Sequence, residues 1–279
     1  MAKFKIFILL LLLSFFFCKT AEDKALSELQ DVHADISAGY FGDVVKIYFV
    51  SSSCLTDDKG LLVFMHGSPG SWQDYKKYLL SDKLRSRFCI VSIDRPGYGN
   101  SSSDKSYPDV MRQASLIHSA LSDFSIRMKK LNSPTVYVGH SYGGPIAAVI
   151  GAMNDKKQNH LVLISAPMDP DLEEVKWFNL LADLKLIKWI LPADLIHSND
   201  EMLPLKSQLF ELSQKWKLQN VSVLIVHGKN DFLVDFENLN YMKKHIRNNL
   251  LKTVELEDEN HFIPWTKFDL VVKNIMELK

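Results

Sequence analysis

The chain has 279 residues, of which 47% are hydrophobic and 24% are charged, and its 33 basic residues balance its 33 acidic residues. This composition is typical of one globular domain, and the lack of a basic excess argues against a protein that neutralises nucleic-acid phosphates. Three cysteines without a CxxC spacing are too few for a disulfide scaffold and do not form the pattern of a structural zinc site.

The N-terminus carries a short apolar segment behind two basic residues. Lys3 and Lys5 precede an apolar run from Ile6 to Phe17 that is interrupted only by Ser14. A helix of this length spans about 18 Å, which is short of the ~30 Å hydrocarbon core of a bilayer. We therefore expect a signal peptide over residues 1–17, with a short membrane anchor as the alternative.

Cys18 follows the apolar run directly, and this arrangement resembles a bacterial lipoprotein signal. Phe17 departs from the small residue that such signals favour before the cysteine. The resemblance implies that Cys18 is a lipidation site and the N-terminus of the mature chain, residues 18–279. It also implies an exported protein of the periplasm or cell envelope, with a membrane tether at this end.

From Val32 onward, short β-branched or aromatic runs alternate with longer segments of helical periodicity. This alternation predicts a mostly parallel sheet with helices on its faces. Residues 32–50 are expected to form two strands around a turn. Apolar runs typical of strands that are buried on both faces follow at residues 61–67, 88–94, 135–141, 160–166 and 221–228.

Between Met168 and Gln219 the chain has about fifty residues of helical character and no predicted strand. Its apolar residues occur at mixed spacing: Trp177, Phe178, Leu181, Leu184, Ile187 and Trp189. Insertions of this length between sheet strands are uncommon unless they are functional. We expect a helical cap over a pocket mouth at about residues 168–219, with ordinary helix packing as the alternative.

The strongest catalytic signal is the motif G-x-S-x-G at residues 139–143, directly after a predicted strand and directly before an apolar helix. In that setting the serine lies on a sharp strand-to-helix turn, and the flanking glycines let neighbouring backbone pass without Cβ clashes. The N-terminus of the helix offers free N–H groups and a positive dipole end to a developing oxyanion. Ser141 is therefore the predicted nucleophile.

With this motif the chain resembles the α/β-hydrolase superfamily. Three further stretches match the superfamily pattern in the expected order: HGSPG at 66–70, DRPGYGNS at 94–101 and HGKND at 227–231. The resemblance implies an α/β fold with a mostly parallel eight-stranded sheet flanked by helices and a helical cap after the sixth strand. It also implies that the backbone N–H groups of Ser68 and Tyr142 form an oxyanion hole.

A serine nucleophile needs a base, and His261 fits that role best among nine histidines. It follows the last predicted strand and a polar turn, and it fits the chain order serine, acid, histidine. Asp231 follows the penultimate strand and is expected to orient the imidazole of His261. Asp235 is the alternative acid, but it is better placed to cap the following helix.

Other polar residues at strand ends are expected to brace loops, namely His66, His140, His227 and Asp94. The superfamily's sheet order would also place the second strand antiparallel beside the fourth, so that Cys54 approaches Cys89. In an oxidising compartment the two could form a disulfide, and the alternative is two idle thiols.

These features predict a carboxylesterase-like serine hydrolase that cleaves a small-molecule ester through an acyl-enzyme on Ser141, without a cofactor or a metal. The HGSPG loop also resembles that of proline iminopeptidase-like and carbon–carbon bond hydrolases, so amide and C–C cleavage remain alternatives. A hydrolase-fold binding protein without catalysis is a third alternative, since a fold does not determine a function. The expected partners are the substrate and a membrane at the N-terminus, and no nucleic acid.

Overall fold

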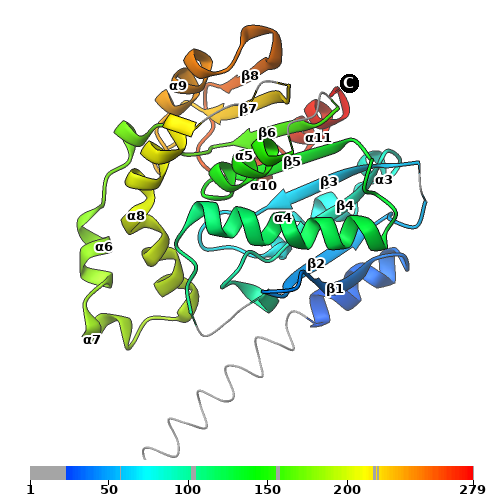
Figure 1. Cartoon of the computed structure of the whole chain (residues 1–279), viewed down its shortest axis with the longest axis horizontal. Helices are drawn as coiled ribbons and strands as arrows, with labels where there is room; N and C mark the ends of the chain where they lie inside the picture. The colour runs from blue at the N-terminus through cyan, green and yellow to red at the C-terminus, as the bar shows by residue number, and fades with distance from the viewer. Residues whose placement is uncertain are drawn as a thin grey trace, which may run out of the picture.

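An eight-stranded sheet runs through the molecule and carries helices on both faces (Figure 1). The computed structural model describes residues 23–278 except 57, 102–104, 155–157, 216–217 and 219. The predicted signal peptide and Cys18 therefore lie outside the described residues. Within the described part of the chain, no helix is both long enough and apolar enough to cross a membrane.

The strands lie in the order β1-β2-β4-β3-β5-β6-β7-β8. Their bounds are β1 (Ser37–Phe41), β2 (Ile47–Ser52), β3 (Gly60–Met65), β4 (Phe88–Ile93), β5 (Thr135–His140), β6 (His160–Ile164), β7 (Ser222–Gly228) and β8 (Leu251–Leu256). Strand β2 pairs antiparallel with both β1 and β4, and all other pairs are parallel. The predicted mostly parallel eight-stranded sheet is thus confirmed.

The central strands bury both of their faces, which explains their near-continuous apolar sequences. In β3, Leu61 and Val63 belong to one core cluster, whereas Leu62 and Phe64 belong to the other. The first cluster is covered by α4 (Val110–Arg127), α5 (Gly143–Met153) and α9 (Glu237–His245). The second is covered by the helix of residues 23–32, α2 (Lys76–Leu79), α3 (Asp82–Arg85), α10 (Ile263–Thr266) and α11 (Phe268–Met276). Short 3-10 turns are η1 (Trp72–Tyr75), η2 (Gly99–Ser101) and η4 (Asn248–Leu250).

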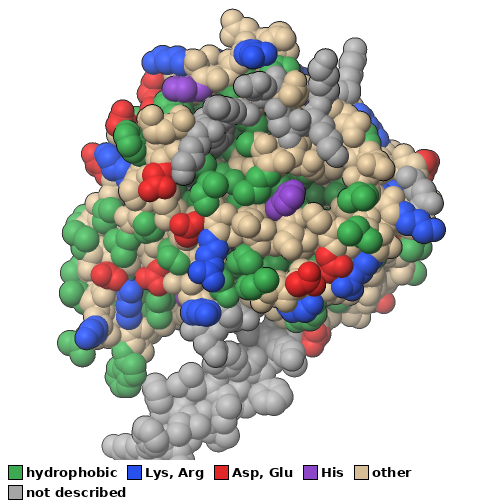
Figure 2. Space-filling model, viewed as in Figure 1, with side chains coloured by type: hydrophobic (Ala, Val, Ile, Leu, Met, Phe, Trp, Pro, Cys, Tyr) green, Lys and Arg blue, Asp and Glu red, His purple; other side chains and the backbone are tan. Residues whose placement is uncertain are grey.

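The segment between β6 and β7 is helical, as predicted, and forms a cap after the sixth strand. It contains η3 (Pro170–Leu172), α6 (Trp177–Ala182), α7 (Lys185–Lys188) and α8 (Ala193–Lys215). Helix α8 is anchored in the first core cluster by Leu205, Leu209 and Leu212. Helices α6 and α7 instead form the outer margin of the molecule, and hydrophobic side chains are visible there in Figure 2.

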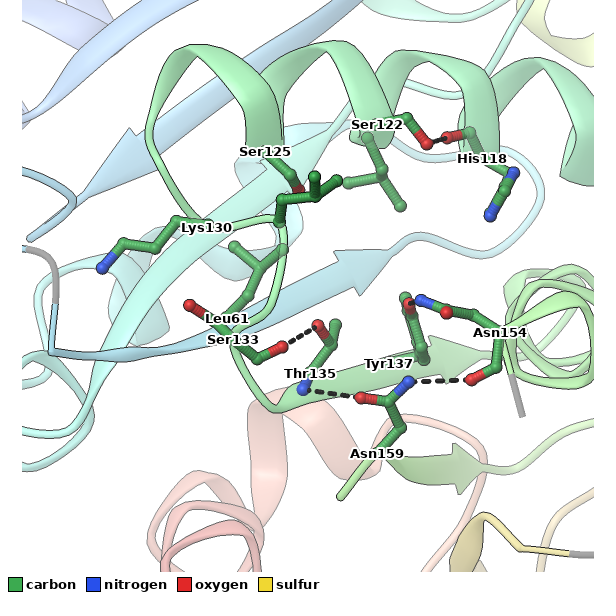
Figure 3. Close-up of a pocket in the computed structure, with 12 residues that line it drawn as sticks. Leu61, His118, Ser122, Ser125, Lys130, Ser133, Thr135, Tyr137, Asn154 and Asn159 are labelled. Carbon is green, nitrogen blue, oxygen red and sulfur yellow. Dashed lines mark hydrogen bonds between the residues drawn. The ribbon is translucent and has the colours of Figure 1, made fainter. Parts of the chain in front are cut away.

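A cavity of about 110 Å³ lies at the amino ends of β3 and β5, the opposite edge of the sheet from the catalytic motif (Figure 3). Its polar groups bind one another. Thr135 N–H donates to Asn159 Oδ1 at 3.0 Å, and Asn154 Nδ2 donates to the hydroxyl of Tyr137 at 2.7 Å. These bonds tie α5 and the loop before β6 to the start of β5, which is a structural role.

Cys54 and Cys89 form a disulfide with an S–S distance of 2.08 Å and a Cα–Cα distance of 4.3 Å. The antiparallel register of β2 on β4, in which Ser52 lies opposite Ile90, brings the two residues together. Both side chains are buried beside the first core cluster. The bond therefore joins the antiparallel edge of the sheet to its parallel centre.

We expect the denatured full chain to gain two titratable thiols on reduction, and Cys54→Ser to abolish that gain. The cross-link closes a loop over a sequence separation of 35 residues. Its loss should lower the free energy of unfolding by up to about 4 kcal/mol through the entropy of the unfolded chain. Thiol titration and urea denaturation measure both effects. An unchanged thiol count on reduction would contradict the disulfide.

Candidate active site

Ser141 lies on a sharp turn between the end of β5 and the start of α5, and its backbone φ is 51°. Positive φ is uncommon for a residue with a side chain, and this is the strained turn that the motif predicts. Two backbone hydrogen bonds hold it: Ser141 N–H donates to Ile164 at 3.0 Å, and Gly144 N–H donates to Ser141 at 2.8 Å. The serine side chain remains partly exposed at the carboxyl edge of the sheet.

The glycines of the motif are required by close backbone contacts. A Cβ at Gly139 would overlap the carbonyl oxygen of Gly143, and a Cβ at Gly143 would overlap that of Met65. A Cβ at Gly67 would lie 3.0 Å from the Cβ of Ser141. The HGSPG loop therefore passes directly beside the candidate nucleophile.

His261 and Asp231 form a buried hydrogen-bonded pair. The Nδ1 atom of His261 lies 2.9 Å from Asp231 Oδ2 and 3.1 Å from Oδ1, and the two side chains are 6% and 0% exposed. With Nδ1–H donated to the carboxylate, Nε2 is left as the acceptor. This is the protonation state that a general base needs.

Asp231 is held as a carboxylate by its surroundings. Burial raises its pKa, but the hydrogen bond and charge of His261 and the N–H groups of Leu233 and Val234 outweigh burial, so the net pKa is lowered. Those two N–H groups donate to Oδ1 at 3.0 and 2.9 Å. Asp235 accepts instead from Glu237 N–H at the start of α9, which is a capping contact.

His140 fixes the His261 loop against the end of β5. Its Nε2 lies 2.9 Å from the carbonyl oxygen of His261, and the centroids of the two rings are 4.7 Å apart. Because His140 directly precedes Ser141, this contact brings the His261–Asp231 pair to the turn. Within the described residues no hydrogen bond joins Ser141 Oγ to His261, and such bonds often tighten only in the substrate complex.

The other strand-end histidines are neutral and bind loops. Burial, followed by the charge of His261, lowers the pKa of His140 to about 3. Burial also lowers the pKa values of His66 and His227. His66 accepts a hydrogen bond from Arg95 N–H at 3.0 Å, and His227 Nε2 lies 3.1 Å from the carbonyl oxygen of Val234.

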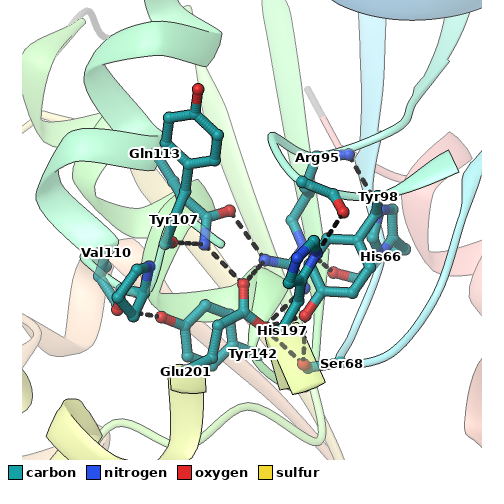
Figure 4. Close-up of polar contacts among 12 residues, drawn as sticks. His66, Ser68, Arg95, Tyr98, Tyr107, Val110, Gln113, Tyr142, His197 and Glu201 are labelled. Carbon is teal, nitrogen blue, oxygen red and sulfur yellow. Dashed lines mark hydrogen bonds and ion pairs between the residues drawn. The ribbon is translucent and has the colours of Figure 1, made fainter. Parts of the chain in front are cut away.

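Behind the HGSPG loop lies a fully buried ion pair between Arg95 and Glu201 (Figure 4). The Nη1 and Nη2 atoms of Arg95 lie 2.6 and 3.1 Å from the carboxylate of Glu201. The same guanidinium donates to the carbonyl oxygens of His66 and Gly67 at 3.0 and 2.8 Å. Arg95 therefore holds the backbone of the loop that carries Ser68.

Glu201 belongs to α8 of the cap, so the pair connects the cap to this loop. Its carboxylate also accepts hydrogen bonds from Gln113 at 2.6 Å, from the hydroxyl of Tyr98 at 2.8 Å and from the hydroxyl of Ser68. Sequence reasoning missed Glu201, because one acidic residue in a long helical segment carries no local signal. Arg95 belongs to the DRPGYGNS stretch, but nothing in the sequence predicts that its side chain is buried or that it pairs with an acid.

Comparison with known proteins agrees with this architecture. A family model described as alpha/beta hydrolase fold matches residues 60–186, which include the HGSPG loop and the Ser141 turn. One solved structure of the same architecture covers the whole chain. The chain has the α/β-hydrolase fold.

Other members of this fold with which the chain aligns differ in their named activities. Epoxide hydrolase 3 of Xenopus tropicalis is 27% identical over 108 residues, which are 38% of this chain and 28% of that relative. The structure of a membrane phospholipase A, titled a bacterial virulence factor, covers 100% of this chain and 98% of its own at 20% identity and a TM-score of 0.62. A 2-hydroxy-6-oxo-6-phenylhexa-2,4-dienoate hydrolase from Rhodococcus sp. strain RHA1 covers 87% and 98% at 15% identity and a TM-score of 0.67. At these identities the structural likeness shows the α/β-hydrolase fold alone.

We expect Glu201→Gln to lower the free energy of unfolding of this α/β-hydrolase-fold protein by about 3 kcal/mol or more, because it leaves the Arg95 charge buried without a counter-charge. Urea denaturation measures the change. Glu211→Gln is the matched control, since Glu211 is exposed on the same helix. Equal destabilisation by the two substitutions would show that the buried pair is not responsible.

Proposed function

We propose that this chain is a serine hydrolase that cleaves a carboxylic ester through an acyl-enzyme on Ser141. The observation that carries the proposal is the buried His261–Asp231 pair, which His140 fixes beside a serine of positive φ at a strand-to-helix turn. Nucleophile, base and orienting acid then come from three loops at one edge of the sheet. This arrangement suits acyl transfer to water.

The proposed reaction has two steps. Ser141 Oγ attacks the ester carbonyl carbon while His261 Nε2 takes the hydroxyl proton, and the N–H groups of Ser68 and Tyr142 receive the charge on the carbonyl oxygen. His261 returns the proton to the leaving alcohol, and the acyl group remains on the serine. A water molecule, deprotonated by His261, then releases the acid. Asp231 orients the imidazole and offsets its charge throughout.

Two observations favour ester chemistry over epoxide or haloalkane opening and over cleavage of a peptide with a free amino terminus. An epoxide-opening or haloalkane-opening enzyme of this fold would use a carboxylate as the nucleophile, and the turn carries Ser141 instead. A peptide substrate with a free amino terminus would need an unpaired carboxylate near the serine. Glu201 and Asp74 both reach the HGSPG loop, but Glu201 is already bound by Arg95, and Asp74 accepts a hydrogen bond from Ser71 N–H at 3.3 Å.

We expect the full chain to hydrolyse p-nitrophenyl esters. Ser141→Ala should lower the rate by up to about 10⁶-fold, the scale found for triad serines. Ser165→Ala is the matched control, because Ser165 has a φ of 47° at the end of the neighbouring strand and its hydroxyl has no hydrogen-bond partner among the described residues.

A serine-directed phosphonate gives a second readout. It should label the wild-type protein at Ser141 and leave Ser141→Ala unlabelled. A folded wild-type chain that neither turns over esters nor accepts the label would contradict the proposal and favour a binding protein. Labelling without ester turnover would direct attention to amide or C–C substrates.

We also propose that the chain is exported and tethered to a membrane through its N-terminus. The support is the sequence alone: Lys3 and Lys5, the apolar run Ile6 to Phe17, and Cys18 directly behind it. In a bacterial host, labelled palmitate should enter the wild-type chain and Cys54→Ser, but not Cys18→Ser. Label that persists after Cys18→Ser, or that never enters the wild type, would contradict lipidation of Cys18.

A further inference from the structure

Residues 177–190, which form α6, α7 and the turns around them, expose an unusual number of large apolar side chains. We call this segment the apolar arm. Trp177, Leu186 and Trp189 are 72%, 82% and 81% exposed, and Phe178, Leu181 and Leu184 are each about half exposed. The arm lies at the outer margin of the molecule in both views (Figures 1 and 2).

The arm is held to the rest of the cap by polar contacts. Asn179 is buried and exchanges hydrogen bonds with Asn199 of α8 at 2.9 and 3.1 Å. Lys188 binds Asp200 of α8 at 2.9 Å and Asp183 of the arm at 2.7 Å. A surface helix of a globular protein normally buries its apolar face and exposes its polar one. Here that arrangement is inverted, which marks a surface that contacts an apolar partner.

The chemistry of the arm fits a lipid bilayer. Indole rings are favoured at the headgroup level of membranes, where an apolar body and a polar N–H are both accommodated. Within the arm, Lys188 is paired with Asp183 and Asp200, whereas Lys185 is exposed and makes no ion pair with the described residues. An exposed lysine beside indole rings suits an anionic headgroup.

The position of the arm fits the same partner. The described chain begins at the helix of residues 23–32, which lies at the lower margin of the molecule in Figure 1, as does α7. Ahead of that helix the sequence carries the apolar run Ile6 to Phe17 and Cys18. An N-terminal membrane tether, which rests on the proposal made above, would hold the arm's side of the molecule towards the bilayer.

We propose that the apolar arm docks the cap onto an anionic lipid bilayer, with the two indole rings at the headgroup level. The arm is then a second membrane contact besides the N-terminus. Docking does not depend on the identity of the reaction at Ser141.

Tryptophan quenching by brominated lipids tests the docking directly in the full chain. With vesicles of phosphatidylcholine and phosphatidylglycerol whose acyl chains are brominated, the wild-type fluorescence should be quenched. Trp177→Phe/Trp189→Phe keeps the arm apolar but removes its reporters, so most of the quenching should disappear. Trp265→Phe is the control and should keep the quenching, since Trp265 packs on His140 away from the arm. Equal quenching of the wild type and the double variant overturns the proposal.

A pair of polar substitutions tests what the docking does. Trp177→Ser/Trp189→Ser should lower the turnover of a long-chain ester presented in the same vesicles by at least tenfold, and leave the turnover of a water-soluble short ester unchanged. The comparison of the two esters distinguishes the two proposals. If the proposed hydrolase activity is wrong, neither ester reacts even in the wild type, whereas loss of docking affects only the ester in vesicles. Equal loss for both esters, or no loss for either, overturns the proposal.

The oligomeric state without vesicles tests a different partner for the arm. If the wild type is a dimer and the double variant is a monomer, the arm contacts a second copy of this chain, and the docking proposal is overturned.

Discussion

The turn at Ser141 exists only because three backbone segments approach one another more closely than side chains would allow. Gly139 lies against Gly143, Gly143 lies against the end of β3 at Met65, and Gly67 lies against Ser141 itself. A side chain at any of these three glycines would come too close to the neighbouring segment, so each position needs glycine. Together the three contacts fix the distance between the HGSPG loop and the serine. The end of β3, the end of β5 and the start of α5 are thereby held as one unit, and the loops that carry His261 and Asp231 pack onto it.

The buried Arg95–Glu201 pair extends this unit into the cap. Removing two charges from water is costly, and a buried pair often contributes little net stability compared with apolar residues of the same size. The main effect of the pair is to fix the position of α8 relative to the HGSPG loop. A guanidinium has a fixed fork of donors, and here those donors reach two carbonyl oxygens of the HGSPG loop and one carboxylate of α8 at the same time. The register of α8 over the loop is therefore set by charge and by hydrogen-bond geometry.

Much of this architecture could be predicted from local sequence signals. Strands that are buried on both faces have apolar sequences of the length of a strand, and the Ser141 turn needs glycines at fixed spacing, so both are visible in a single chain. Glu201 could not be found in this way, because its partner Arg95 is 106 positions away and either residue alone looks like a surface charge. The direction of the cap's apolar residues could not be found either. Mixed spacing at Trp177, Leu184 and Trp189 does not define one helical face, and the structure turns these side chains outward where the sequence had suggested a pocket mouth.

The two parts of the cap are attached to the rest of the protein by different kinds of contact. Glu201 accepts hydrogen bonds from Arg95, Gln113, Tyr98 and Ser68, and a swing of α8 as a rigid body would break all of them and leave the Arg95 charge buried alone. Loss of one partner of a buried pair costs about 3–5 kcal/mol, so such a swing would be rare. The apolar arm is attached by two contacts with α8: the buried Asn179–Asn199 pair, and the ion pair of Lys188 with the partly exposed Asp200. Helix α8 is therefore the part of the cap that keeps the HGSPG loop in place beside Ser141, through Glu201 and Arg95.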